Sequence, residues 1–345
     1  MKRTSYHVIG VDMGATNIVC VLSNKEGKII TRDISKTLGS EGKEKTISQI
    51  VNSARNVLKE GEKLGVSAKS ILGMGIGGPG PINSDDGIIY VAPNIPGLIN
   101  ISLAEELGDE LDLPVFLEND ANAAALGEWW LGAGKDVDNL VLLTLGTGIG
   151  GGIIIDGEVL HGSAHVAGEV GHMIIREGGL LCGCGNRGCL EAHASAKAVV
   201  KRTLAEIEKG EKTVLTDEVN NELEKITCKM VFDTAKKGDS LCKKIVEDTA
   251  KYLGVGIINI VNIINPQMII LSGGMSKAGD FLFEPVRKYV KEHAFNDAVR
   301  EVKIVPAMLG PNAGAIGAVA FVLKKKGLLK KADRASSSII ELTEV

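Results

Sequence analysis

The sequence predicts an α/β protein built from two similar domains, and this prediction follows from its length, a repeated strand pattern and the helices after each repeat. At 345 residues the chain is longer than one average domain. Segments that begin near residues 6 and 140 share one layout, in which β-branched strands flank a glycine turn. Each is followed by residues with helical spacing, from 47 to 58 and from about 236 to 264.

The first segment is predicted to form three strands joined by two tight turns. Residues 7–12 and 18–22 are rich in β-branched residues and flank Gly14, and a third strand begins near Lys28. In the second segment, residues 140–145 and 152–155 flank the turn Gly146-Thr147-Gly148. The chain therefore contains an internal duplication at the level of its hairpins.

Two further strands end in residues suited to ligand binding. Residues 71–76 lead into Gly77-Gly78-Pro79-Gly80, and residues 115–118 lead into Asn119 and Asp120 at the start of an alanine-rich helix. Open α/β sheets bind ligands beyond the carboxyl ends of their strands. We therefore expect these two strand ends and the two glycine turns to form the walls of the site.

The predicted domains run from residue 1 to 119 and from residue 120 to 311. A helix at about 312–326 carries a face of small residues for close packing, and we expect it to join the first domain. The chain turns polar beyond it, and we expect the tail, 327–345, to be loosely ordered.

Composition and charge exclude several classes of function. The 39 basic and 43 acidic residues give a net charge of −4, and no basic stripe with interleaved aromatic residues is present, so we expect no nucleic-acid partner. The start of the chain lacks a secretion signal, and the most apolar stretch, 252–264, is too short to span a membrane. We expect a cytoplasmic protein that acts on small molecules and has no membrane partner.

Three of the six cysteines lie close together and form a metal-binding pattern with a histidine. The pattern His-x9-Cys-x-Cys-x4-Cys supplies four ligands of the types that zinc prefers, and four protein ligands leave no open position for water. It predicts a closed, structural zinc site rather than a catalytic one. The alternatives are His193 as the fourth ligand, or free thiols without a metal. The predicted ligands are His172, Cys182, Cys184 and Cys189.

The two glycine turns have the chemistry of a nucleotide phosphate site. Each presents backbone N–H groups and a threonine hydroxyl, and Asp12 at a strand end can hold Mg²⁺ through water. A single glycine hairpin is more often structural, but the pair in a duplicated layout favours phosphate binding. Neither turn fits the Walker or Gly-x-Gly-x-x-Gly patterns. Gly273-Gly274 after a strand lets a flat heterocycle such as adenine approach, although a plain strand-to-helix turn has the same sequence.

Asp120 has two possible roles. It can cap the helix that follows, or it can accept a proton from an attacking hydroxyl while Asn119 orients a sugar. A helix N-terminus lowers the basicity of Asp120, but phosphoryl transfer tolerates a weak base because positioning and charge neutralisation supply most of the catalysis. Glu169 and Glu191 flank the metal loop, which would hold two carboxylates in place for neighbouring sugar hydroxyls; ordinary surface glutamates are the alternative.

Together these motifs resemble the ROK family of repressors, open reading frames and kinases, within the hexokinase-like and actin-like ATPase superfamily. The resemblance runs from about residue 6 to about 326. It implies an actin-like ATPase (hexokinase/ribonuclease H-like) fold, with two similar domains around a cleft and a zinc-stabilised loop. The motifs are Asp12-x-Gly14-x-Thr16, Gly77-Gly-Pro-Gly-Pro81, Glu118-Asn-Asp-Ala-Asn122, Gly146-Thr-Gly-Ile-Gly-Gly151, Gly168-Glu-Val-Gly-His172, Cys182-Gly-Cys-Gly-Asn-Arg-Gly-Cys-Leu-Glu191 and Leu271-Ser-Gly-Gly274.

The resemblance also implies a role for each site residue. It makes Asp120 the catalytic base and implies ATP, Mg²⁺ and a structural Zn²⁺ as cofactors. The implied sugar-binding residues are Gly78, Asn94, Asn119, Asp120, Glu169, His172 and Glu191. The implied nucleotide-binding residues are Asp12, Gly14, Thr16, Gly146, Thr147, Gly148, Gly273 and Gly274.

The function that the resemblance implies is transfer of phosphate from ATP to the 6-hydroxyl of a hexose, with glucose first. Fructose, mannose, allose or an N-acetylhexosamine is the alternative substrate, and a non-catalytic sugar-binding regulator is the alternative class. The presence of Asp120 favours an enzyme. Repressors of the family carry a winged-helix domain before the first glycine turn, and since only 11 residues precede Asp12 we expect none. We also expect a homodimer or homotetramer.

Overall fold

The computed structural model describes residues 6–92 and 94–329, and these fall into two compact units. The first unit contains the described residues up to Asn139, Gly152–Gly168 and those from Met308 onward; the second contains Leu140–Gly151 and Glu169–Ala307. The predicted boundaries, 1–119 and 120–311, remain a prediction, because packing does not tell which segments move together. Most of the predicted tail, 327–345, lies outside the described residues.

The first unit is built on a mixed five-stranded sheet with the order β3-β2-β1-β4-β8. β1, β2 and β3 are antiparallel neighbours, which confirms the predicted three-stranded start, and β4 and β8 run parallel to β1. The strands are β1 (His7–Met13), β2 (Asn17–Asn24), β3 (Ile29–Lys36), β4 (Ile71–Gly78) and β8 (Val115–Asn119). A small antiparallel sheet contains β5 (Ile82–Asn83), β6 (Ile88–Val91) and β7 (Ile99–Ile101).

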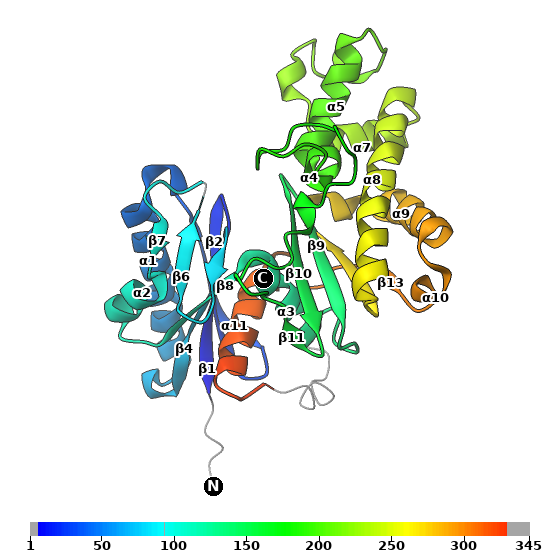
Figure 1. The fold of residues 1–345 in the computed structure, drawn as a ribbon. Coiled ribbons are helices and arrows are strands. Elements are labelled where there is room, and N and C mark those ends of the chain that lie inside the picture. The colour runs from blue at the N-terminus through cyan, green and yellow to red at the C-terminus, as the bar shows by residue number, and fades with distance from the viewer. Residues whose placement is uncertain (1–5, 93, 330–345) are drawn as a thin grey trace. The chain divides into compact units, whose positions relative to one another are not determined.

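Two helices cover opposite faces of this sheet. Ile9 and Val11 of β1 belong to a buried core with residues of α1 (Lys43–Lys63), whereas Gly10 lies against α11 (Ala313–Lys325), where a Cβ would come 2.1 Å from the Ala315 carbonyl oxygen. Because neighbouring residues of a strand point to opposite faces, α1 and α11 must lie on different sides, as Figure 1 shows. The unit also contains α2 (Leu103–Leu111) and α3 (Asp120–Leu131). The predicted helix at 312–326 is confirmed as α11.

The second sheet repeats the order of the first. Its order is β11-β10-β9-β12-β13, so in both sheets the third, second and first strands are followed by the fourth and fifth. β12 is parallel to β9 and to β13. This confirms the predicted duplication of the strand layout. The strands are β9 (Leu140–Leu145), β10 (Ile149–Ile155), β11 (Glu158–Val159), β12 (Met268–Ser272) and β13 (Lys303–Pro306).

Helices of the second unit pack around its strands, and the longest is α8 (Ser240–Ile264). The predicted run from 236 to 264 is interrupted, because Gly238 has a φ of 108° and Asp239 caps α8 by accepting the N–H of Cys242. Within the described residues, no helix is long and apolar enough to cross a membrane. The other helices are α4 (Leu190–Ala194), α5 (Ala196–Glu208), α6 (Leu215–Glu218), α7 (Cys228–Lys236), α9 (Asp280–His293) and α10 (Asn296–Val299).

Short 3₁₀ helices connect several of these elements. They are Gly39–Glu41, Ala68–Ser70, Val170–His172, Leu223–Lys225, Gly274–Ala278 and Gly310–Asn312. Two of them belong to predicted site segments, since one ends at His172 and another begins at Gly274.

Candidate functional site

In the first unit, three parallel strands end side by side at one edge of the sheet. Asp12 of β1 pairs in register with Gly77 of β4, and Gly77 pairs with Glu118 of β8. Gly78 is opposite Asn119, the last residue of β8. The sheet therefore brings together the ends of three motifs that are far apart in the sequence.

Asp12 is a partly buried carboxyl group at this edge. A Cβ at Gly314 would lie 2.5 Å from its carboxyl carbon, so Asp12 packs against the first turn of α11. Burial, and secondly the negative charge of Asp120, raise the pKa of Asp12 to about 7. Near neutral pH this carboxyl binds a proton readily, and a bound cation would oppose that shift by stabilising the carboxylate form.

Asn119, not Asp120, caps helix α3. Asn119 is extended, with φ −63° and ψ 146°, and its side-chain oxygen accepts the N–H of Ala121 at 2.9 Å and that of Asn122 at 3.2 Å. Its amide nitrogen donates to the Gly80 carbonyl oxygen at 3.1 Å, which leaves one amide hydrogen for a ligand. Asp120 is the first helical residue, and its Oδ1 also accepts the N–H of Ala121, at 2.7 Å.

The remaining predicted residues of the first unit lie in turns around the strand ends. Gly14 and Thr16 form the tight turn between β1 and β2, and Thr37 braces it by donating to the Gly14 carbonyl oxygen at 2.6 Å and to the Thr16 carbonyl oxygen at 3.0 Å. Gly78 is the last residue of β4. Asn94 is exposed in the connection between β6 and β7.

In the second unit, the four predicted metal ligands form one cluster. The donor atoms of His172 and the three cysteines all lie within 4.8 Å of one another. The Sγ atom of Cys182 is 3.7 Å from Nδ1 of His172, and the Sγ atoms of Cys184 and Cys189 are also 3.7 Å apart. A tetrahedron with zinc–sulfur bonds of about 2.3 Å has edges of about 3.8 Å, so the donor set fits a zinc ion.

The surroundings of the three cysteines shift the pKa values of their thiols in different directions. Burial raises the pKa of the Cys189 thiol to about 12 and also raises that of Cys182, while the Asn186 backbone N–H lowers the pKa of the exposed Cys184. Metal binds the thiolate form, so binding releases protons that burial otherwise holds in place. The side chains are therefore close enough for zinc, but two of the thiols need the metal to ionise.

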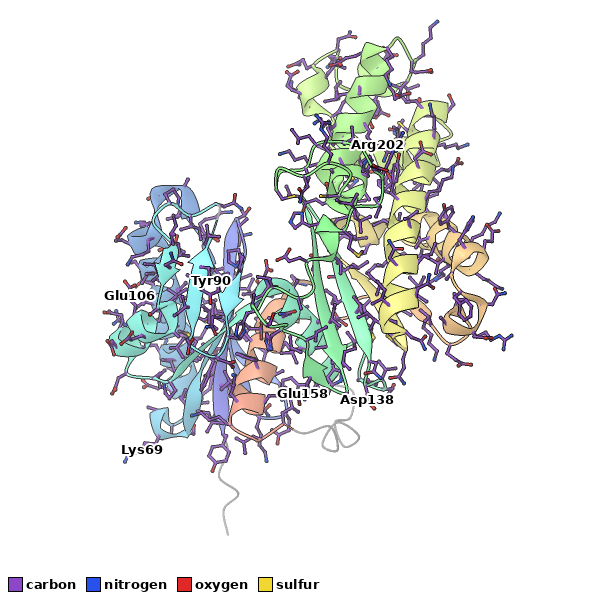
Figure 2. All side chains as sticks on the ribbon, viewed as in Figure 1. Lys69, Tyr90, Glu106, Asp138, Glu158 and Arg202 are labelled. Atoms are coloured by element: carbon purple, nitrogen blue, oxygen red, sulfur yellow. The ribbon has the colours of Figure 1, made fainter. Side chains whose placement is uncertain are left out.

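His193, the alternative fourth ligand, lies outside the cluster. Its Nε2 accepts the N–H of Leu180 at 3.2 Å, and its ring packs 4.7 Å from that of Tyr252. Arg202, which Figure 2 shows between α5 and α8, donates to the His193 carbonyl oxygen at 3.0 Å. The alternative ligand set with His193 is wrong for this structure. His193 is not part of the cluster of donor atoms, and its imidazole accepts a hydrogen bond from the metal loop at Leu180.

Glu169 and Glu191 both approach the metal cluster. Oε2 of Glu169 is 3.8 Å from Nε2 of His172, the ring nitrogen that does not face Cys182. Oε1 of Glu191 is 3.8 Å from the Sγ atom of Cys182, and its Oε2 accepts the N–H of Ile149 at 2.9 Å. Both carboxylates thus lie beside residues that would hold the metal.

The second glycine turn opens on a pocket. Gly146 and Thr147, with Gly274 at the start of a 3₁₀ helix, line a cavity of about 460 Å³. Gly273, with φ 86°, lies so close to Leu145 that a Cβ would be 2.5 Å from its carbonyl oxygen. One wall belongs to α7, which the sequence motifs did not identify. Its lining residues there are Cys228, Lys229, Phe232, Asp233 and Lys236.

Each unit therefore gathers a separate part of the predicted residues. The first unit holds Asp12, Gly14, Thr16, Gly78, Asn94, Asn119 and Asp120. The second unit holds Gly146, Thr147, Gly148, Glu169, His172, Cys182, Cys184, Cys189, Glu191, Gly273 and Gly274.

Comparison with known proteins gives consistent matches over nearly the whole chain. The family model described as the ROK family matches residues 8–325. A glucokinase of Thermotoga maritima is 38% identical over 320 residues, covering 93% of this chain and 98% of that protein. A xylose repressor of Caldicellulosiruptor bescii is 34% identical over 316 residues, covering 92% of this chain and 78% of that protein.

Solved structures give the same result. The crystal structure of a ROK family glucokinase from Streptomyces griseus, in complex with glucose and AMPPNP, matches with a TM-score of 0.75 and 32% identity. The match covers 91% of this chain and 98% of that chain.

Proposed function

Because this chain belongs to the ROK family, we propose that it is a sugar kinase that transfers the γ-phosphoryl group of ATP to the 6-hydroxyl of a hexose, most specifically glucose. Family membership and the two mixed five-stranded sheets confirm the predicted actin-like ATPase fold class. The percentage of identical residues does not separate a kinase from a regulator, since it is 38% for the glucokinase and 34% for the xylose repressor.

The observation that carries the proposal is the position of Asp120. It is the first residue of α3, at the sheet edge where Asp12 also lies, and its charge raises the pKa of Asp12. Asn119 takes over the capping of α3, so the helix does not depend on Asp120 for its start. From this position at the sheet edge, the Asp120 carboxylate would align a sugar hydroxyl and take its proton late in phosphoryl transfer.

The nucleotide-binding role falls to the two glycine turns. The N–H groups of Gly14 and Gly146 are bonded within their own turns, so the later N–H groups of the two turns are the candidates for phosphate oxygens, and Asp12 is the candidate to hold Mg²⁺ through water. When bound, Mg²⁺ neutralises phosphate charge. The pocket beside Gly274, with Phe232 of α7 in its wall, has the size and apolar side chains to take the nucleoside.

The sugar-binding role is assigned to polar groups near the strand ends and the metal cluster. Asn119 retains one amide hydrogen, and Glu169 and Glu191 each lie 3.8 Å from a predicted metal ligand. Gly78 and Asn94 are further candidates, and His172 would serve both the sugar and the zinc. Zinc bound by His172, Cys182, Cys184 and Cys189 would be structural, because the four ligands complete its shell.

A panel of sugars tests the proposal. Formation of ADP from ATP is measured with glucose, fructose, mannose, allose, N-acetylglucosamine and N-acetylmannosamine, and turnover with glucose is expected to be the fastest. Asp120→Asn is expected to lower kcat by roughly a hundredfold or more while glucose still binds. The matched control is Asp109→Asn, an exposed carboxylate of α2, which should remain active. If none of these sugars is phosphorylated, the kinase proposal is contradicted.

A second candidate function is a sugar-responsive regulator without catalysis, because xylose repressors are similar over most of the chain. Xylose, a pentose without a 6-hydroxyl group, distinguishes the two. Binding of xylose together with no turnover of any hexose supports the regulator, whereas rapid glucose turnover excludes it.

We further propose that the enzyme acts in the cytoplasm, where ATP is available, as a homodimer or homotetramer. Light scattering during size-exclusion chromatography tests this assembly, and a mass of one chain at micromolar concentration would contradict it.

A further inference from the structure

Glu191 of α4 connects two sites that the sequence treats as separate. Its Oε1 faces the Sγ atom of Cys182 at 3.8 Å, and its Oε2 accepts the N–H of Ile149 at 2.9 Å. Ile149 is the first residue of β10, directly after the turn Gly146–Gly148. All of these residues belong to the second unit. One carboxyl group therefore contacts a metal ligand and the end of the nucleotide turn.

Two further contacts attach the same turn to the metal loop. The N–H of Ala196, which follows α4, donates to the Gly146 carbonyl oxygen at 2.9 Å. Gly171, the neighbour of His172, lies so close to the turn that a Cβ would be 2.0 Å from the Ile149 carbonyl oxygen. The turn thus contacts Gly171, the neighbour of the first metal ligand in the sequence, and Ala196, the first residue of the helix that follows α4.

The glycines of the turn respond differently to Glu191. A Cβ at Gly148 would lie 2.3 Å from Oε2 of Glu191, whereas a Cβ at Gly146 would meet nothing within 4 Å. Neither glycine has a positive φ. A side chain at residue 148 would therefore have to displace the Glu191 carboxylate, whereas the backbone conformation of Gly148 does not itself require glycine.

The backbone of Glu191 is itself fixed by the metal loop. It lies two residues after the ligand Cys189, and the N–H of Leu190 donates to the Met173 carbonyl oxygen at 2.9 Å, next to the ligand His172. A bound metal would hold both of these segments together, since His172 belongs to one and Cys189 to the other. The position of the Glu191 carboxylate depends on these two segments. The hydrogen bond from the Ile149 N–H to this carboxylate therefore depends on them too, and so does the conformation at the end of the turn.

We propose that Glu191 is a positioning residue for the nucleotide turn, so that the metal loop sets the geometry in which Gly146–Gly148 receives phosphate. The proposal rests on the proposed function for its nucleotide part, and it goes beyond the predicted role of Glu191 in sugar binding. The same carboxylate would then contact the sugar and the turn. Loss of the metal should accordingly weaken nucleotide binding even when no sugar is present.

Hydrogen exchange of the Ile149 amide tests the positioning role without any ligand. In the full-length, zinc-loaded chain this amide should exchange at least about tenfold faster in Glu191→Ala, and also after removal of the metal by a chelator. The matched control is Glu177→Ala, an exposed glutamate of the same loop, which should leave the rate unchanged. An unchanged rate in Glu191→Ala overturns the proposal.

A double-mutant cycle tests the consequence for nucleotide binding. The Kd of Mg-AMPPNP is measured calorimetrically without sugar for Gly148→Ala and Gly146→Ala, each in the wild-type and the Glu191→Ala background. Gly148→Ala should weaken nucleotide binding at least about fivefold more in the wild-type background than in the Glu191→Ala background. In the second background, the carboxylate that the new methyl group would displace is absent. Gly146→Ala should have the same effect in both backgrounds. Equal effects of Gly148→Ala in both backgrounds overturn the proposal.

The two experiments separate failure of this proposal from failure of the proposed function. A wild-type chain that binds no nucleotide contradicts the kinase function, while exchange at Ile149 still decides whether Glu191 positions the turn. Metal content and circular dichroism establish that each variant is folded. If Gly148→Ala does not fold, the exchange rate in Glu191→Ala remains decisive.

Discussion

Oε2 of Glu118 lies 2.7 Å from Nε2 of His161, at the strand end that leads into α3. Glu118 is fully buried, and its Oε1 accepts the backbone N–H of Asn119 at 2.8 Å and the side-chain amide of Asn122 at 3.0 Å. The hydroxyl of Ser84 also donates to Oε1, at 3.2 Å. A buried carboxyl group thus organises the start of α3, and His161 supplies its partner.

Replacing His161 should destabilise the protein because it leaves a buried carboxyl group without its partner. We expect His161→Leu to lower the free energy of unfolding by about 2–4 kcal/mol. His161→Gln, which keeps a hydrogen-bond donor, should cost less than half as much. Urea denaturation measures both. Equal costs for the two variants would show that the contact with Glu118 contributes no more than packing.

The same pair makes stability depend on pH. The hydrogen bond that His161 donates to Glu118 raises the pKa of His161; the charges of Glu118 and Asp85 act in the same direction, whereas burial and the charge of Lys325 oppose them. Because the folded pKa lies above the unfolded value, the contribution is complete below the unfolded pKa and is lost as the pH rises through the folded one. The stability difference between the wild type and His161→Gln should therefore shrink as the pH rises above the unfolded pKa of about 6.5 and through the higher folded pKa. A constant difference would contradict a charged His161.

Asp12 should oppose stability at neutral pH when no cation is bound. Burial and then the charge of Asp120 raise its pKa to about 7, so the folded protein holds a proton that the unfolded chain has already lost. The free energy of unfolding should fall by up to about 4 kcal/mol between about pH 4 and pH 7 through this group. Asp12→Asn should remove this dependence of stability on pH and should stabilise the protein at pH 8 when no Mg²⁺ is bound, while lowering turnover. Denaturation at several pH values checks the slope, which should be unaffected in Asp109→Asn.

The sequence predicted best those features that are encoded over short distances. The spacing of His172 and the three cysteines was sufficient for the cluster, because few other structures need those ligand types in one segment. The carboxyl ends of β1, β4 and β8 were also identified, since each strand is apolar and stops at glycine or acid. Their meeting at one edge follows from the rule for parallel strands.

Features that depend on backbone angles or distant contacts were not predicted. Asn119 and Asp120 are both good capping residues, and only the extended backbone of Asn119 decides which of them caps α3. His161 reaches Glu118 across 43 residues, and no spacing rule connects them. The α7 wall of the pocket carries no motif, because its amphipathic pattern is that of any surface helix. Such contacts are set by tertiary packing rather than by local sequence.

Metal content should distinguish the two histidines near the cysteine cluster. His172→Ala removes a ligand and should lose most of the bound zinc, whereas His193→Ala should keep about one zinc per chain. His193→Ala should instead loosen the loop, because the Leu180 N–H loses its acceptor. Elemental analysis and the thermal midpoint of each variant check this. Loss of zinc from His193→Ala alone would restore the ligand set that the structure contradicts.

Glu128 should be one of the most sensitive residues for the stability of the first unit. It is fully buried in α3, and its Oε1 accepts the N–H of Met308 at 3.0 Å and that of Leu309 at 2.8 Å. Its Oε2 accepts the N–H of Ala133 at 2.8 Å. The carboxyl group thereby holds the segment that enters α11, which packs on α3 so closely that a Cβ at Gly317 would overlap the Ala123 carbonyl oxygen.

Removing that carboxyl group leaves three backbone N–H groups without an acceptor, of which that of Leu309 is buried and those of Met308 and Ala133 are partly buried. We expect Glu128→Ala to lower the free energy of unfolding by about 3–5 kcal/mol, whereas Glu128→Gln, which keeps one oxygen, should cost about 1–2 kcal/mol. Urea denaturation provides the comparison, with Glu105→Ala, an exposed position of α2, as the control that should change little. Because α3 begins at Asp120, loosening of its contact with α11 should also lower kcat in Glu128→Gln before the unit unfolds. A Glu128→Ala variant with unchanged stability would mean that water replaces the carboxyl group, so that this carboxyl group does not fix the position of α11 on α3.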